Sequence, residues 1–201
     1  MDWAFNKKEK LLFFPDEHLG RNTGVAHGIN LEDMILWKPN EEMGGNSEEE
    51  VEKAKLILWQ GNCPIHQLFT PKQINRLRQD VPEIQILVHP ECRYEVVQMA
   101  DLSGSTAYII KVIEEAPAGS KWGIGTEMHL VNRLADQHLD KWITSIDPSM
   151  CLCTTMNRVD APHLLWILEN LLDDEVINHI TVEPDISYWA KVALDRMLQI
   201  V

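Results

Sequence analysis

Short apolar runs alternate with segments of helical periodicity through the middle of the chain. Runs of four or five mainly apolar residues are typical of strands buried in a parallel sheet. They are followed by segments with apolar residues at helical spacing, several of which begin at a capping residue. Strands alternating with helices favour an α/β fold whose parallel sheet is covered on both faces. The predicted strands are 11–14, 56–59, 84–88, a short one near 102, and 122–126, and the predicted helices are 70–80, 94–99, 105–115 and 127–137.

The remaining segments have a different character. Residues 16–20 are predicted to be a loop after the first strand, and the Gly/Pro/acidic stretch 39–46 a surface excursion, followed by a short helix capped by Ser47. Residues 161–172 show an amphipathic stripe, and 186–198 a terminal helix after a break at Pro184. We interpret both late helices as structural.

Charge and composition argue against several classes of partner. Lys+Arg 18 against Asp+Glu 31 gives a net charge of -13, which argues against a nucleic-acid partner. No apolar run reaches the roughly 20 residues of a membrane helix, and the N-terminus lacks the apolar core of a secretory signal. We therefore expect a cytoplasmic chain without a membrane partner, whose four cysteines stay reduced. Buried free thiols remain the simple expectation for Cys92 and Cys151.

Polar residues follow four predicted strands at their carboxyl ends, where parallel α/β sheets bind ligands. We expect these residues to converge on one rim of the sheet. Cys63 and Cys153 are far apart in sequence, and two such thiolates suggest a metal or cluster held by separate parts of the fold. No zinc-finger spacing, dinucleotide-binding glycine motif or P-loop occurs. The polar residues on the predicted rim are Cys63 and His66, His89 and Glu91, Ser105 and Thr106, and Thr126 and Glu127.

Two of these pairs allow more than one interpretation. His89 and Glu91 are two residues apart, so in an extended segment both side chains meet one substrate for proton transfer or carboxyl recognition. A structural histidine–carboxylate pair is the alternative. Ser105 and Thr106 at a helix start suit a phosphate or carboxylate, whereas an ordinary helix cap is the simpler explanation.

The motifs in their order resemble the quinolinate synthase family over nearly the whole chain. The resemblance implies three pseudo-symmetric α/β domains, each a three-layer αβα unit with a small parallel sheet. It also implies one [4Fe–4S] cluster held by three cysteines, with one iron open as a Lewis acid. The implied activity is the condensation of iminosuccinate (iminoaspartate) with dihydroxyacetone phosphate to quinolinate in NAD biosynthesis. The matching motifs are PDEHLG (15–20), WQGNCPIH (59–66), HPE (89–91), ADLSGST (100–106), GTE (125–127), CTTM (153–156) and ALDRML (193–198).

The resemblance also assigns roles by motif. It implies that Cys63 and Cys153 are two of the three cluster ligands, the C-x-x-M context selecting Cys153 over Cys151. His66 and Glu91 are the implied catalytic residues, with His66 near the cluster. The implied substrate-binding residues are His89, Glu91, Ser105 and Thr106. L-aspartate oxidase or aspartate dehydrogenase is the implied upstream enzyme.

The family pattern predicts the domain organisation too. Residues 1–62 match the C-terminal part of a second α/β domain, with an inserted excursion at about 29–55; residues 63–153 match a third domain, and 154–201 match helices that pack back on the first domain. About 100 family residues or more, including the third cysteine, have no counterpart here. We therefore expect a truncated chain, inactive and marginally stable alone. The alternatives are a non-catalytic remnant or a small-anion-binding α/β module without a cluster, its cysteines coincidental.

Overall fold

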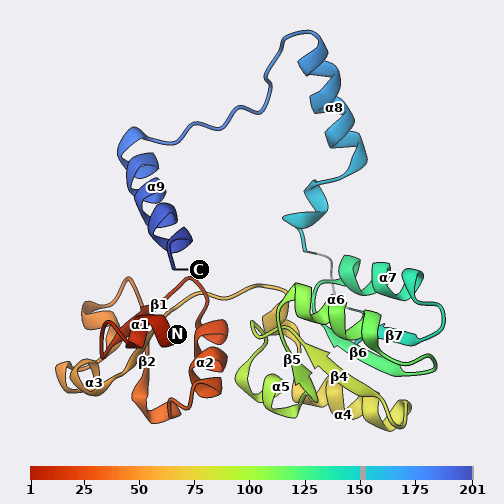
Figure 1. Ribbon diagram of the computed structural model, residues 1–201, viewed down its shortest axis with the longest axis horizontal. Coiled ribbons are helices and arrows are strands. Elements are labelled where there is room, and N and C mark those ends of the chain that lie inside the picture. Colours follow the sequence, from red (N-terminus) through yellow and green to blue (C-terminus); the bar gives the residue numbers. More distant parts are fainter. Residues whose placement is uncertain (150–152, 201) are drawn as a thin grey trace. The chain divides into compact units, whose positions relative to one another are not determined.

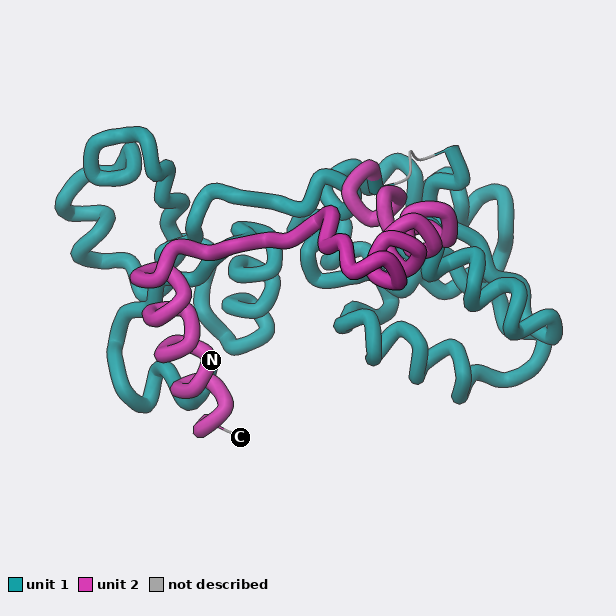
Figure 2. Tube along the Cα trace, turned by 90° about the horizontal axis from the view of Figure 1, so that it is seen from above, with its two compact units in different colours: residues 1–153 teal, residues 154–201 magenta. Residues whose placement is uncertain are grey.

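The computed structural model describes residues 1–149 and 153–200, and its chain divides into two units, 1–153 and 154–201 (Figure 2). Unit 1 contains two parallel sheets (Figure 1). The strands are β1 (Leu11–Phe13), β2 (Met34–Trp37), β3 (Leu56–Trp59), β4 (Gln85–Val88), β5 (Leu102–Ser103), β6 (Lys121–Gly125) and β7 (Trp142–Ser145). The α-helices of unit 1 are α1 (Asp2–Phe5), α2 (Glu17–Ala26), α3 (Glu48–Lys53), α4 (Pro71–Asp80), α5 (Tyr94–Met99), α6 (Thr106–Glu115) and α7 (Met128–Gln137).

The first sheet has the order β1-β3-β2, with the last strand in sequence at its centre. Leu56 and Leu58 of β3 are buried on the face that α2 covers. The helix approaches closely because it carries glycine there: a Cβ on Gly20 would lie 2.7 Å from Leu58 Cδ2. The opposite face is covered less, and Leu12 of β1 remains 52% exposed.

The second sheet has the order β5-β4-β6-β7 and two helical layers. Alternate residues of β4 point to opposite faces, as in any strand. Ile86 and Val88 pack with residues of α4 and α5, whereas Leu87 packs with residues of α6 and α7. This sheet is therefore a three-layer αβα structure, and the predicted α/β fold with small parallel sheets is confirmed.

The chain changes direction across the second sheet between β4 and β6. From β4 it passes through α5 to β5 on one side, and it returns through α6 to β6 on the other side. The loops after β4 and β6 therefore leave the sheet as neighbours at a topological switch point, which is where open α/β sheets bind ligands.

Several local predictions were wrong. Residues 16–20 are not a loop, because Asp16 accepts a hydrogen bond from the Leu19 N–H and caps α2. β7 was not predicted. The segment 29–55 is not wholly an excursion, since β2 pairs with β3 along its length. The predicted terminal helix is present as α9, but it begins two residues earlier than predicted, at Pro184. The division into family domains stays a prediction.

Unit 2 contains α8 (Ala161–Leu172) and α9 (Pro184–Leu198). No residue of these two helices, all of which the structure describes, is buried. Leu168 is 51% exposed and Trp189 is 64% exposed, so the apolar faces predicted for these helices are exposed. Packing of these helices on a further domain stays a prediction. Among the described helices, none has both the length and the apolar character needed to span a bilayer.

Candidate functional site

Three loops at the carboxyl ends of β3, β4 and β6 bring His66, Glu91 and Thr126 together. His66 lies in a short 3-10 turn, His66–Leu68, and its ring is buried. Its Nδ1 is 2.8 Å from Glu91 Oε2, and its Nε2 is 3.1 Å from Thr126 Oγ1. The convergence predicted for the strand ends is confirmed for these residues.

The protonation of the pair follows from its contacts. The hydrogen bond from His66 lowers the pKa of Glu91, so this carboxylate is ionised at neutral pH and can only accept. His66 Nδ1 therefore carries the hydrogen and donates to Glu91. In the neutral form of the His66 ring, Nε2 then accepts a hydrogen bond from the Thr126 hydroxyl. A hydrogen-bonded imidazole and carboxylate at a sheet rim can hold a proton and pass it on.

His89 stacks on His66, with ring centroids 4.5 Å apart and planes 18° from parallel. The Glu91 N–H donates to His89 Nδ1 at 3.3 Å, which leaves the hydrogen of a neutral ring on Nε2. Burial lowers the pKa of His89, and the neighbouring His66 lowers it further. At neutral pH His89 is therefore an uncharged ring that offers an N–H donor. The two side chains lie close together, as the two-residue spacing predicted, but His89 Nδ1 and Glu91 Oε2, 3.8 Å apart, are both acceptors and form no bond with each other while His89 is uncharged.

Cys63 enters the same group from the loop after β3. Its sulfur, His66 and Glu91 each offer a ligand atom, and these atoms lie within 4.8 Å of one another. The backbone of Cys63 is fixed, because its N–H donates to Asp16 Oδ2 at 2.9 Å. Asp16 is buried, and its other oxygen accepts from the Leu19 N–H at 2.7 Å. One carboxylate thus ties the start of α2 to the Cys63 loop.

A [4Fe–4S] cluster fits the donor chemistry of this position. Such clusters are held by cysteine thiolates, and Cys63 is a free, half-exposed thiol at a strand end. Cys153 is also free and half-exposed, but it is not a member of the group formed by Cys63, His66 and Glu91. Cys151 lies outside the described residues. Cys92 is a core thiol whose sulfur contacts the Gly125 carbonyl, and burial raises its pKa.

Ser105 and Thr106 lie at the same edge as His89. β4 and β5 pair Val88 with Ser103, so the loops that follow them begin side by side. The Ser105 hydroxyl caps α6 by accepting from the Tyr108 N–H at 3.3 Å, and Thr106 is exposed in the first turn. The simpler cap interpretation of Ser105 is therefore confirmed. Its role toward a substrate stays a prediction.

Two supporting residues were not recognised from the sequence. Asp16 was assigned to a loop, although aspartate is among the residues preferred at the N-cap of a helix. Asn22 is buried in α2 and donates through Nδ2 to the carbonyls of Pro90 and Cys92, each at 2.8 Å. It therefore holds the loop that carries His89 and Glu91. No local sequence pattern predicts such a contact, because the partners are 68 and 70 residues away.

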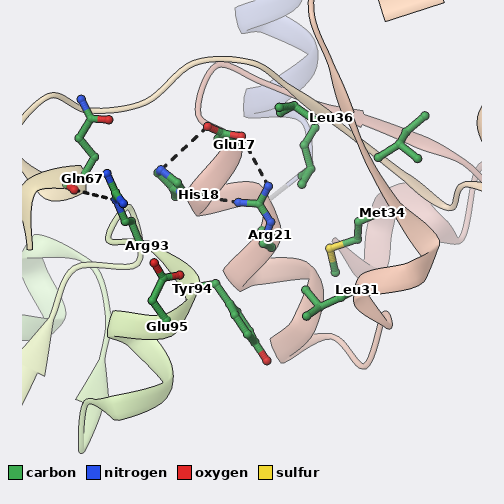
Figure 3. Close-up of a pocket in the computed structure, with 12 residues that line it drawn as sticks. Glu17, His18, Arg21, Leu31, Met34, Leu36, Gln67, Arg93, Tyr94 and Glu95 are labelled. Carbon is green, nitrogen blue, oxygen red and sulfur yellow. Dashed lines mark hydrogen bonds and ion pairs between the residues drawn. The ribbon is translucent and has the colours of Figure 1, made fainter. Parts of the chain in front are cut away.

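A cavity of about 560 Å³ lies beside α2, and Figure 3 shows its charged lining. Arg21 is paired with Glu17 at 3.5 Å and lies 3.3 Å from His18 Nδ1, while Arg93 donates to the Gln67 carbonyl. Its lining does not include the Cys63, His66 and Glu91 group. Since the Arg21 charge is already paired, we assign the functional site to that group and not to this cavity.

Comparison with known proteins agrees with the motif pattern. Residues 23–199 match the family model described as Quinolinate synthetase A protein. Quinolinate synthase of Geobacillus kaustophilus is 52% identical over 200 residues, covering 100% of this chain and 54% of that protein. Quinolinate synthase of Anoxybacillus flavithermus is 54% identical over 196 residues, 98% of this chain and 53% of that protein.

A third relative gives the same result. Quinolinate synthase of Rhodopirellula baltica is 48% identical over 201 residues, which are 100% of this chain and 51% of that protein. The chain thus spans about half the length of the curated relatives it matches. With the family model covering most of its residues, the chain belongs to the quinolinate synthase family.

Proposed function

We propose that this chain supplies the acid–base group and part of the cluster-binding set of a quinolinate synthase. The reaction is the condensation of iminosuccinate with dihydroxyacetone phosphate to quinolinate, a transferase reaction of NAD biosynthesis. The observation that carries the proposal is the contact of His66 with Glu91 beside the Cys63 thiol, in a chain of this family. L-aspartate oxidase or aspartate dehydrogenase would supply the imine.

The roles of the residues follow from their contacts. Glu91 is the base that takes a proton from the substrate, because the hydrogen bond from His66 keeps its carboxylate ionised. His66 shares this proton through the 2.8 Å contact and returns it to the substrate. The neutral ring of His89 offers an N–H to a substrate carbonyl or carboxylate. We assign Ser105 and Thr106, at the start of α6, to binding of the phosphate or a carboxylate.

We assign two cluster ligands to Cys63 and Cys153. A bound [4Fe–4S] cluster with an open iron supplies Lewis-acid chemistry to substrate oxygens. Asp16 holds the loop of the first thiolate through the Cys63 N–H. The buried thiol of Cys92 takes no part, because burial keeps it protonated.

A chimera tests the proposal directly. This chain replaces the matching portion of the Geobacillus kaustophilus enzyme, and the protein is produced without oxygen in cells that overproduce the cluster-assembly machinery. We expect about four iron and four sulfide per protein, and quinolinate from the two substrates. Cys63→Ser and Cys153→Ser should each lose the cluster and the activity, whereas Cys92→Ser should keep both. A full cluster in either of the first two variants would overturn the ligand assignment.

A binding experiment on the chain alone distinguishes the enzyme from the alternative, a small-anion-binding module. A small-anion-binding module without a cluster would bind phosphate or dicarboxylate equally well after Cys63→Ser. Isothermal titration with dihydroxyacetone phosphate compares the two proteins. Equal affinity in both, together with a chimera that has no activity, would favour the binding module over the enzyme.

A further inference from the structure

We propose that Cys63, His66 and Glu91 also form a site for a single divalent cation of the zinc class, independent of Cys153 and of any cluster. A thiol sulfur, an imidazole nitrogen and a carboxylate oxygen already lie within 4.8 Å of one another. These are the three donor types that zinc binds, and three protein ligands with one open position are typical of catalytic zinc centres.

The three ligand atoms must move by up to about 1 Å to reach the geometry of a zinc site, since their separations extend to 4.8 Å. Zinc bonds of about 2.0–2.3 Å place neighbouring ligand atoms of a tetrahedral site roughly 3.3–3.7 Å apart. The His66 Nδ1 and Glu91 Oε2 atoms are 2.8 Å apart, so they must separate by about 0.5 Å as the ion enters. Glu91 is a half-buried side chain on a loop, so a rotation of its carboxylate accommodates this change.

The surroundings of the three ligands have the supporting contacts of a metal site. A metal-bound histidine usually donates its second ring N–H to an oxygen, which fixes the ring and its tautomer. Here Thr126 Oγ1 lies 3.1 Å from His66 Nε2, and Thr126 is only 4% exposed. Asp16 fixes the Cys63 backbone in the same manner. These two contacts are independent of the ligand atoms themselves.

Protons and charge balance on binding. The Cys63 thiol releases its proton to solvent, and the His66 hydrogen moves from Nδ1 to Nε2, where Thr126 accepts it. One thiolate and one carboxylate then neutralise the two positive charges of the ion. Solvent takes the fourth position.

Occupancy by a single ion excludes a cluster at the same sulfur. The Cys63 thiolate cannot serve both, so zinc bound here should block cluster assembly in a protein that otherwise forms one. The proposal does not rest on the proposed enzymatic function, because it concerns only the described residues of this chain.

Cobalt(II) is the probe, added to the purified chain without oxygen and without sulfide, so that no cluster forms. A thiolate ligand gives a charge-transfer band in the near ultraviolet, and tetrahedral cobalt gives strong visible bands. We expect about one cobalt per chain, displaced by zinc. Cys63→Ser should abolish the charge-transfer band. His66→Gln and Glu91→Gln should each weaken binding, and Thr126→Val should weaken it about 10–100-fold.

The double variant Cys151→Ser/Cys153→Ser is the matched control, and it should bind cobalt as the parent chain does. Circular dichroism and urea unfolding of every variant separate loss of the site from loss of the fold. A charge-transfer band that survives Cys63→Ser, or that disappears in the double variant, would overturn the proposal. So would unchanged affinity in both His66→Gln and Glu91→Gln.

Discussion

Asp16 makes two contacts whose energies can be separated by substitution. Its carboxylate caps α2 through the Leu19 N–H at 2.7 Å and holds the Cys63 N–H at 2.9 Å. Losing a helix cap costs about 1 kcal/mol. A hydrogen bond to a carboxylate contributes about 1.5–3 kcal/mol, and the carboxylate of Asp16 is buried. Asp16→Ala should therefore lower the free energy of unfolding by about 2.5–4 kcal/mol.

Asp16→Asn isolates the second contact. Asparagine caps helices as well as aspartate does, but its amide nitrogen would face the Cys63 N–H as a second donor. We expect a loss of about 1.5–3 kcal/mol in urea unfolding followed by tryptophan fluorescence. Thr70→Ala is the matched control, since Thr70 caps α4 without contacting the site. It should cost about 1 kcal/mol.

The same variants should differ in metal binding. Releasing the Cys63 loop should weaken cobalt binding by about 10-fold in Asp16→Asn, and Thr70→Ala should leave it unchanged. If Asp16→Asn unfolds within about 0.5 kcal/mol of the parent chain and binds cobalt equally well, Asp16 does not position the thiol.

Three further substitutions test other contacts. Asn22→Ala leaves two carbonyls of the β4–α5 loop without their donor and should cost about 2–3 kcal/mol in urea unfolding, whereas exposed Asn75→Ala should stay within about 0.5 kcal/mol; similar values for both would refute this role. Burial lowers the pKa of His18, so the unfolded chain binds its proton first as the pH falls below about 6.5. Urea midpoints should fall from pH 7.5 to 5.5, and less so in His18→Gln; an equal fall in both would refute the assignment. Gly61→Ala would place a Cβ 2.3 Å from a backbone oxygen and should cost about 1–3 kcal/mol, so an unchanged midpoint would contradict this packing.

The regular elements of the second sheet were predictable because their signals are local. Ile84 to Val88 is an apolar run, and Thr70 with Pro71 marks the start of α4. α2 was missed because its buried positions include Gly20 and Gly24, which fit against β3 but give no apolar periodicity. Such a helix is specified by close packing on the sheet, which only the tertiary structure shows.

The candidate site was predicted in part, because its residues follow strands that the sequence predicts. Strand ends in a parallel sheet share one edge, so the meeting of His66 with Glu91 follows from topology. The supporting contacts of Asp16 and Asn22 join residues 47 to 70 positions apart, and no local pattern encodes them. The assignment of Cys153 depends on the family resemblance, and a metal centre joining it to Cys63 stays a prediction.

The central claim is that Glu91 moves protons at a centre whose metal is held by Cys63. Glu91→Gln in the chimera tests this most directly, by measuring cluster content and quinolinate formation in the same preparation. The account predicts a full complement of iron and sulfide with turnover reduced by about 10²–10⁴-fold. Unchanged turnover at full cluster content would contradict it.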